Sequence, residues 1–228
     1  MMKMKTNKVF ENTASQIKST TEILKAKGFV VFDIPPQKII NDKCQQLTWQ
    51  NHHSGRSVSS KAFLKIEQYL DILSTNAYQL LLSDYSIIRY SFVFDGSRLE
   101  QQNVLWWPCP VKMDEETENE FGIVEGIKQK VNASQNQSDF IMRSPIRIDF
   151  DSKNDEISHP RAHAHIAHPE CRINSDHPIC FNRFMKFIID NFYPQEKINF
   201  KKWNILSYQY NDAHKKQTYN NSTTIIID

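Results

Sequence analysis

Hydrophobic residues recur along the chain with two periods, one typical of helices and one typical of strands. Within residues 9–27 the apolar side chains that would share one helix face are Phe10, Ala14, Ile17 and Leu24. Their spacing predicts an amphipathic helix, and Gly28 is the kind of residue that commonly follows a helix end. Further helices are predicted at 61–73, near 120–130 and at 179–192.

Runs rich in β-branched and aromatic residues predict strands, most clearly in the middle of the chain. The strands with the strongest signal are predicted at 78–84 and 86–96. Asp95-Gly96 indicates a hairpin turn that leads into a third strand at 104–111. Other strands are predicted at 29–34, 47–53, 144–151, 161–168 and 222–228. Because helices and strands do not alternate regularly, we predict an α+β fold, a mainly antiparallel sheet with amphipathic helices packed on one face.

Length and composition favour a single domain. The chain has 228 residues, of which 24% are charged and 11% aromatic, so a sizeable core is expected. We predict one domain, 1–228, with an N-terminal α/β subregion at 1–75. The region 76–228 then holds the sheet and a histidine-rich hairpin. The polar segment 131–139 is the best candidate for an insertion or a boundary.

Charge, cysteine content and hydropathy exclude several classes of protein. A net charge of +2 is too small to predict polyanion binding from charge balance alone. The four cysteines are too sparse for a disulfide scaffold. The basic N-terminus becomes polar at once, unlike a signal peptide, and no apolar run is long enough to span a membrane. We therefore expect a cytoplasmic protein that does not associate with membranes.

The segment DFDSKNDEISHPRAHAHIAHPEC, residues 149–171, holds four of the eight histidines. Polar and apolar residues alternate in the strand that leads into it and again in the strand within it. If these two strands are neighbours, their apolar faces must coincide, and so must their polar faces. The polar face then consists of Arg147, Asp149, His163 and His165.

The apolar face of this hairpin needs a cover, which the helix at 179–192 supplies. Its hydrophobic residues recur at helical spacing and form one stripe, made of Phe181, Phe184, Met185, Ile188 and Phe192. Packing of this stripe against the hairpin would leave the polar face directed toward a cleft, a partner or water.

The polar face suits two kinds of chemistry. Two histidines at i and i+2, with a carboxylate from the neighbouring strand, are good ligands for zinc, iron or manganese. The same residues suit metal-free acid–base catalysis by Asp149 and His163, assisted by His165, with Arg147 stabilising a phosphoryl group. The simplest alternative is a solvated surface whose histidines only form hydrogen bonds.

Two further metal-binding patterns overlap this region. The near repeat HPEC…HPIC supplies four ligands at the spacing of a zinc knuckle: His168, Cys171, His177 and Cys180. His163 and His165 followed by Glu170 also resemble the first metal motif of the cupins, although the glycines of that motif are absent. The cofactor stays open, with a divalent metal, zinc or manganese, as the candidate.

The motif HPRAHAHIAHPECRI and the helix that ends in FYP resemble an uncharacterised bacterial family known only as a domain of unknown function, DUF2290. The matching residues are His159, Pro160, His163, Cys171, Arg172, Ile173, Phe184, Phe187, Phe192, Tyr193 and Pro194. Asn174 stands where the family tends to have proline. Three histidines fall outside the family pattern, which weakens both the double-histidine site and the zinc knuckle; they are His165, His168 and His177.

The family resemblance implies no known activity and favours a bacterial accessory protein. An Arg-x-Asp strand followed by a histidine-bearing strand is also similar to small toxins of toxin–antitoxin pairs. We hypothesise an accessory or effector protein of a defence or toxin-type system, with a nuclease site on the polar face and a protein partner encoded by a neighbouring gene. The alternatives are a non-catalytic subunit that binds a protein or nucleic acid, and a cupin-like metalloprotein.

Overall fold

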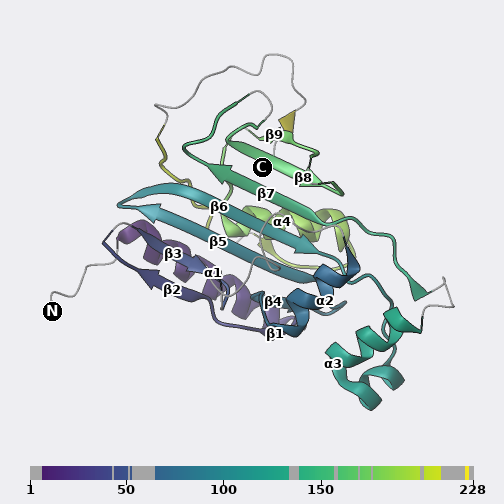
Figure 1. The fold of residues 1–228 in the computed structure, drawn as a ribbon. Helices are drawn as coiled ribbons and strands as arrows, with labels where there is room; N and C mark the ends of the chain where they lie inside the picture. The colour runs from purple at the N-terminus through teal and green to yellow at the C-terminus, as the bar shows by residue number, and fades with distance from the viewer. Residues whose placement is uncertain are drawn as a thin grey trace.

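The chain forms one large sheet with long helices packed against it (Figure 1). The structure, a computed structural model, describes residues 7–42, 44–50, 52, 65–133, 139–156, 159–168, 170–175, 177–200, 203–211 and 224–225. Its helices are α1 (Lys8–Ala26), α2 (Ile66–Ser74), α3 (Glu115–Asn132) and α4 (Phe181–Phe192). Its strands are β1 (Val30–Asp33), β2 (Gln37–Ile40), β3 (Gln45–Thr48), β4 (Leu80–Leu82), β5 (Ile87–Asp95), β6 (Arg98–Trp107), β7 (Ile146–Asp151), β8 (Ala162–Ile166), β9 (Ile173–Ser175) and β10 (Thr224–Ile225).

All the described strands belong to this sheet, in the order β1-β4-β5-β6-β7-β8-β9-β10. The long strand β5 pairs with β4 near its start and with β3 near its end, and β3 pairs in turn with β2. Every described pair is antiparallel except β9 with β10. The predicted α+β class with a mainly antiparallel sheet is therefore confirmed.

The helices α1 and α4 lie together behind the sheet in Figure 1 and cover the same face. α1 begins after Asn7, whose side chain accepts a 2.7 Å hydrogen bond from the Phe10 backbone N–H. It ends before Gly28, which has a φ of +71° that favours glycine. The helix predicted at 9–27 is thus confirmed. It places its hydrophobic stripe in the main core.

The predicted stripe of α4 is buried as expected, apart from its last member. The first four members of the stripe are fully buried and share one cluster with Ile148 and Ala164 of the hairpin strands. They are Phe181, Phe184, Met185 and Ile188. Phe192 is 36% exposed because it ends the helix, and its ring packs against Trp106 at 4.4 Å between centroids. A smaller cluster on the other face joins α2 to Leu105 and Trp107 of β6.

Several predicted boundaries change in the structure. α3 begins earlier than expected because Asp114 caps it, accepting a 2.8 Å hydrogen bond from the Thr117 N–H, and acidic residues in its first turn favour a helix start. The end of α3 takes up the start of the predicted loop 131–139. Parts of four predicted segments lie outside the described residues: 51 and 53 of the strand 47–53, 61–64 of the helix 61–73, 134–138 of the polar loop, and most of 222–228. None of the described helices combines the length and hydrophobicity needed to cross a membrane.

Candidate functional site

Two neighbouring rows of side chains cross the sheet on the face opposite α4. Strand pairing aligns the first row as Arg89, Leu105, Arg147 and His165. It aligns the second row as Ser91, Asn103, Asp149, His163 and Asn174. The predicted pairing of the strands around the histidine segment is confirmed, since β7 and β8 are antiparallel neighbours. All four predicted polar-face residues lie within these rows.

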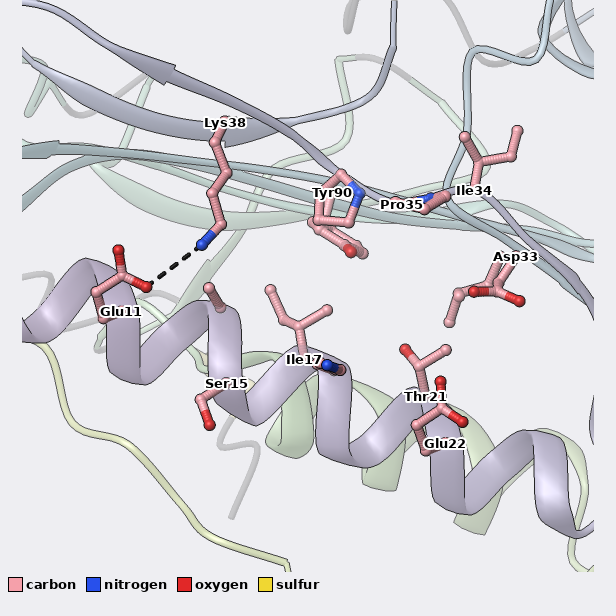
Figure 2. A pocket seen from close by; sticks show the side chains of 14 residues that line it. Glu11, Ser15, Ile17, Thr21, Glu22, Asp33, Ile34, Pro35, Lys38 and Tyr90 are labelled. Atoms are coloured by element: carbon pink, nitrogen blue, oxygen red, sulfur yellow. Dashed lines mark hydrogen bonds and ion pairs between the residues drawn. The ribbon is translucent and has the colours of Figure 1, made fainter. Parts of the chain in front are cut away.

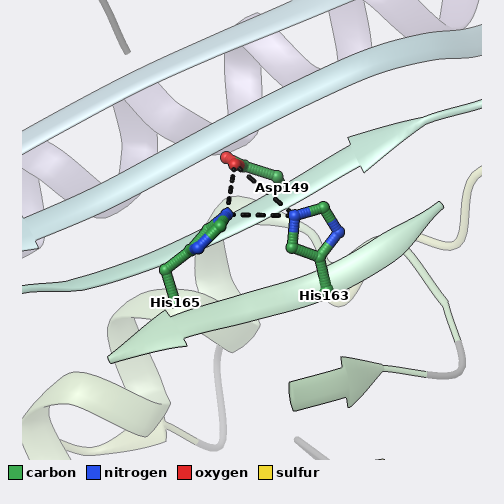
Figure 3. A group of neighbouring side chains, drawn as sticks. All are labelled: Asp149, His163 and His165. Carbon is green, nitrogen blue, oxygen red and sulfur yellow. Dashed lines mark hydrogen bonds and ion pairs between the residues drawn. The ribbon is translucent and has the colours of Figure 1, made fainter. Parts of the chain in front are cut away.

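Asp149 of β7 and His163 and His165 of β8 converge toward the β8 end of the rows (Figure 3). The two Nε2 atoms are 3.0 Å apart, and the Asp149 Oδ2 atom is 3.2 Å from His165 Nε2 and 3.9 Å from His163 Nε2. Three atoms with these separations lie on a circle of radius about 2.0 Å, a usual length for a zinc–nitrogen or zinc–oxygen bond. The three ligand atoms are therefore close enough together to share one divalent metal ion. In the part of the chain that the structure describes, no other group of three such ligands converges.

Neighbouring groups orient each member of the cluster. The Nδ1 atom of His163 is 2.6 Å from the Pro160 carbonyl, which can only accept, so Nδ1 carries the proton and Nε2 offers a lone pair. Arg147 donates to Asp149 Oδ2 at 2.8 and 2.7 Å, and Asn103 donates to Oδ1 at 2.6 Å. A histidine whose second nitrogen is bound to a carbonyl is the usual arrangement around a protein metal.

Burial and charge set the protonation states in the cluster. Burial lowers the pKa of His163 to about 4, against the opposing effect of Asp149, so the ring is neutral near neutral pH. Burial alone would raise the pKa of Asp149, but the hydrogen bond with His165 and the charge of Arg147 outweigh it and lower that pKa. The cluster therefore presents one carboxylate and at least one neutral imidazole.

The polar face is less accessible than the alternation of residues indicated. His163 and His165 are each 2% exposed and Arg147 is 5% exposed, whereas 21% of the Asp149 side chain is exposed. The prediction that this face points away from α4 is correct, and the burial of the imidazole rings argues against the alternative of a solvated surface. Any ligand would reach the cluster from the side of Asp149.

Arg89 is a residue of this site that the sequence interpretation missed. It is fully buried on β5, in the same row as Arg147, and its guanidinium lies 4.4 Å from the ring centroid of Trp49. Burial and the charge of Arg147 lower its pKa to about 9, while Asp149 opposes this effect. The available signal was a lone arginine within the apolar run SIIRYSFVF.

The structure does not bring the four predicted zinc-knuckle residues together. His168 is exposed after β8, and Cys180 is fully buried at the start of α4. His177 is exposed, and its Nδ1 forms a 2.8 Å hydrogen bond with the Tyr210 hydroxyl. Cys171 is half-buried. Glu170, the third residue of the cupin-like pattern, pairs with Arg172 at 3.1 Å instead of joining the histidines.

Comparison with known proteins places this site within a family of unknown activity. The model of a family described as an uncharacterized conserved protein, DUF2290, matches residues 33–227, which include every residue of the two rows. No curated protein and no solved structure matches the chain.

Proposed function

The chain belongs to the DUF2290 family of uncharacterized conserved proteins, and we propose that it is a metal-dependent nuclease. Asp149, His163 and His165 would hold the metal, a divalent ion such as zinc or manganese. The reaction would be the hydrolysis of a phosphodiester bond, in which water adds to phosphorus and an alcohol leaves. In this role the protein would act as an effector or accessory component of a bacterial defence or toxin-type system.

The observation that carries this proposal is the spacing of the three ligand atoms. Their separations match a single ion bound at ordinary bond lengths, and three protein ligands leave positions open for water and substrate. Two of these ligands already have the supporting hydrogen bonds that such sites use: His163 donates to the Pro160 carbonyl, and Asp149 accepts from Asn103.

The chemistry of a phosphodiester also fits the charges around the cluster. When bound, a divalent ion would lower the pKa of a coordinated water and polarise a phosphoryl oxygen. Arg147 and Arg89 add two positive charges beside the carboxylate, which favours an anionic substrate and stabilises charge that develops on it. Arg147 also fixes the Asp149 oxygen that faces both imidazoles. The positive charge of Arg147 also repels a metal cation. The metal affinity therefore depends on both effects, the orientation of Asp149 and this repulsion.

The test combines elemental analysis with cleavage assays on single-stranded RNA and DNA. We expect the purified protein to carry about one divalent metal per chain and to cleave one of these substrates. Asp149→Asn, His163→Asn and His165→Asn should each lose both metal and cleavage. His168→Asn is the matched control because this exposed histidine lies outside the cluster. A wild-type protein that binds no metal when supplied with zinc or manganese would refute the metal site.

The burial of both imidazole rings supports a second candidate, a non-catalytic subunit in which the same cluster stabilises the fold. The metal would then raise the melting temperature, and the variants above would lose metal and stability while no substrate is cleaved at any protein concentration. Metal binding without cleavage would therefore favour this candidate over the nuclease.

The biological setting is a separate part of the proposal. It is supported by the similarity of the Arg147-x-Asp149 strand and its histidine-bearing neighbour to small toxins. We propose that the protein acts in the cytoplasm with a partner encoded by a neighbouring gene. Expression of the wild type should slow bacterial growth, whereas Asp149→Asn should not, and co-expression of the partner should restore growth. Equal growth with both forms would contradict a toxic role.

A further inference from the structure

A cavity of about 580 Å³ lies on the opposite side of the sheet from the Asp149 cluster. Figure 2 shows it between α1 and the strands that face this helix, with Pro35 and Ile34 at its edge. Small-molecule sites typically have volumes of roughly 300–1,000 Å³. The cavity is therefore large enough for a compact organic ligand, and it shares no lining residue with the proposed metal site.

The walls of this cavity are mainly apolar. Its hydrophobic lining comes from α1, from the segment after β1, and from β4, and consists of Ala14, Ile17, Ile34, Pro35, Pro36 and Leu80. Such a lining binds the apolar part of a ligand through removal of hydrophobic surface from water. It does not by itself select a ligand, so selectivity depends on the polar groups that reach the same space.

Two hydroxyl groups point into the cavity with their hydrogen-bonding capacity unused. Tyr90 is 1% exposed and Thr21 is 6% exposed, and Figure 2 shows both side chains directed into the space between helix and sheet. The Tyr90 ring is held by edge-on contact with Phe181. Among the residues that the structure describes, neither hydroxyl has a hydrogen-bond partner. Both hydroxyls are therefore free to form a hydrogen bond with a molecule that enters the cavity.

The charged groups at the rim of the cavity largely neutralise one another. Lys38 pairs with Glu11 at 3.3 Å, and Asp33 pairs with Lys25 at 2.7 Å. The remaining two rim charges, Lys18 and Glu22, are of opposite sign and exposed to solvent. The rim thus offers no net charge to attract an ion, and a charged ligand would have to break these pairs.

We propose that this cavity binds a small, uncharged and largely apolar molecule that carries a carbonyl or ether oxygen. The Tyr90 hydroxyl donates a hydrogen bond to that oxygen, and Thr21 supplies a second contact. The apolar body of the ligand packs against Ile17 and Leu80. This site is independent of the proposed nuclease function, because it lies on the other face of the sheet.

The test uses three probes that share a naphthalene ring: 1-acetylnaphthalene, 1-ethylnaphthalene and 1-naphthoate. Each is titrated into the full chain while backbone amide resonances are followed by NMR. We expect the ketone to shift amides of α1 and of β5 around Tyr90. It should bind roughly fivefold more tightly than the hydrocarbon, since one neutral hydrogen bond separates them. The carboxylate should bind at least about tenfold more weakly than the ketone, because it is charged.

Tyr90→Phe tests the hydrogen bond directly, since it removes one oxygen that has no protein partner. This variant should lose most of the preference for the ketone, because only the Thr21 contact remains, and its affinity for the hydrocarbon should be unchanged. Thr20→Val is the matched control on the same helix, because the Thr20 hydroxyl bonds Asn182 at 2.5 Å instead of facing the cavity. It should keep the preference for the ketone. Ala14→Phe, which fills the cavity, should weaken the binding of all probes.

Three results would overturn the proposal. The first is the absence of localised shifts with every probe up to its solubility limit. The second is equal binding of ketone and hydrocarbon to the wild type, and the third is an unchanged preference in Tyr90→Phe. Thr21→Val provides an independent check if Tyr90→Phe is unstable. It should reduce the preference for the ketone, and an unaltered preference would count against the site.

Discussion

His163 is kept neutral by its surroundings, and this has a measurable effect on stability. Its pKa is about 4 in the folded protein, below the value of about 6.5 expected in the unfolded chain. Between these two values the unfolded chain takes up a proton that the folded protein does not. The contribution of neutral His163 to the free energy of unfolding is therefore fully present above about pH 6.5 and is lost as the pH falls toward 4.

We predict that the free energy of unfolding of metal-free protein decreases by up to about 3 kcal/mol between pH 7 and pH 4 from this group alone. The measurement is urea denaturation across this range with a chelator present. His163→Gln should remove most of this dependence, since it cannot titrate. His177→Gln is the control, because His177 is exposed. A wild type with the same stability at both pH values would contradict the neutral state of His163.

A single hydroxyl, that of Tyr193, connects the end of α4 to the sheet. It accepts a 3.1 Å hydrogen bond from Trp106 Nε1 and lies 3.0 Å from Asp84 and 3.1 Å from Ser86. Tyr193→Phe should cost about 1–3 kcal/mol in unfolding free energy, because it leaves the buried indole N–H without an acceptor. Tyr85→Phe serves as the comparison and should cost less. Its hydroxyl bonds Glu118 near the surface, where water can replace the lost contact.

At the scale of elements, α4 is the main cover of the hairpin formed by β7 and β8. Phe184 is completely buried in the cluster that contains Ile148 and Ala164. Phe184→Ala should therefore lower the unfolding free energy by about 3–5 kcal/mol through loss of buried area and creation of a cavity. Phe187→Ala, on the half-buried side of the same helix, should cost clearly less. Denaturant titration of both variants measures the difference, and equal costs would contradict the assigned helix face.

The period of apolar residues predicted the long elements well, because α1, α4, β5 and β7 each bury one side along most of their length. It did not predict β2 and β9, which are four and three residues long. Strands this short are defined by their partners and not by a pattern of their own. Pro35 and Pro36 separate β2 from β1 and made the preceding strand look like an isolated segment.

The candidate site was predictable only in part. Alternation placed Arg147, Asp149, His163 and His165 on one side of two strands, because side-chain direction in a strand depends only on position. The contribution of Arg89 and Asn103 depends on the register of β5 with β6 and of β6 with β7, which joins residues far apart in sequence. The burial of the imidazoles likewise depends on tertiary packing, which local sequence does not encode.

At the scale of the whole molecule, we propose that residues 1–228 form a single cooperative unit. In the described part of the expected subregion 1–75, Phe10, Ile17 and Leu24 of α1 belong to the same buried cluster as Phe181 and Phe184 of α4. Circular dichroism and tryptophan fluorescence should therefore report one coincident unfolding transition. Two separated transitions would indicate independent units.

Removal of residues 1–28 should prevent folding. The three large side chains that α1 buries are each worth about 1.5–3 kcal/mol, and their sum is comparable with the total stability of about 5–15 kcal/mol of a typical domain. The shortened chain should lose its near-ultraviolet dichroism and elute as aggregates on size exclusion. Phe10→Ala in the full chain is the milder comparison and should fold with a lower melting temperature. A stable, monomeric shortened chain would contradict the role of α1 in the core.

The pleat of β8 also determines which changes of length the site can tolerate. Residues inserted after the exposed Lys153, between β7 and β8, leave Asp149 opposite His163 and Arg147 opposite His165. One residue inserted between His163 and His165 would instead turn one imidazole toward the phenylalanines of α4. Variation in the length of this loop therefore keeps the register of the cluster, whereas one residue inserted within the strand puts an alanine in the place of one of its histidines.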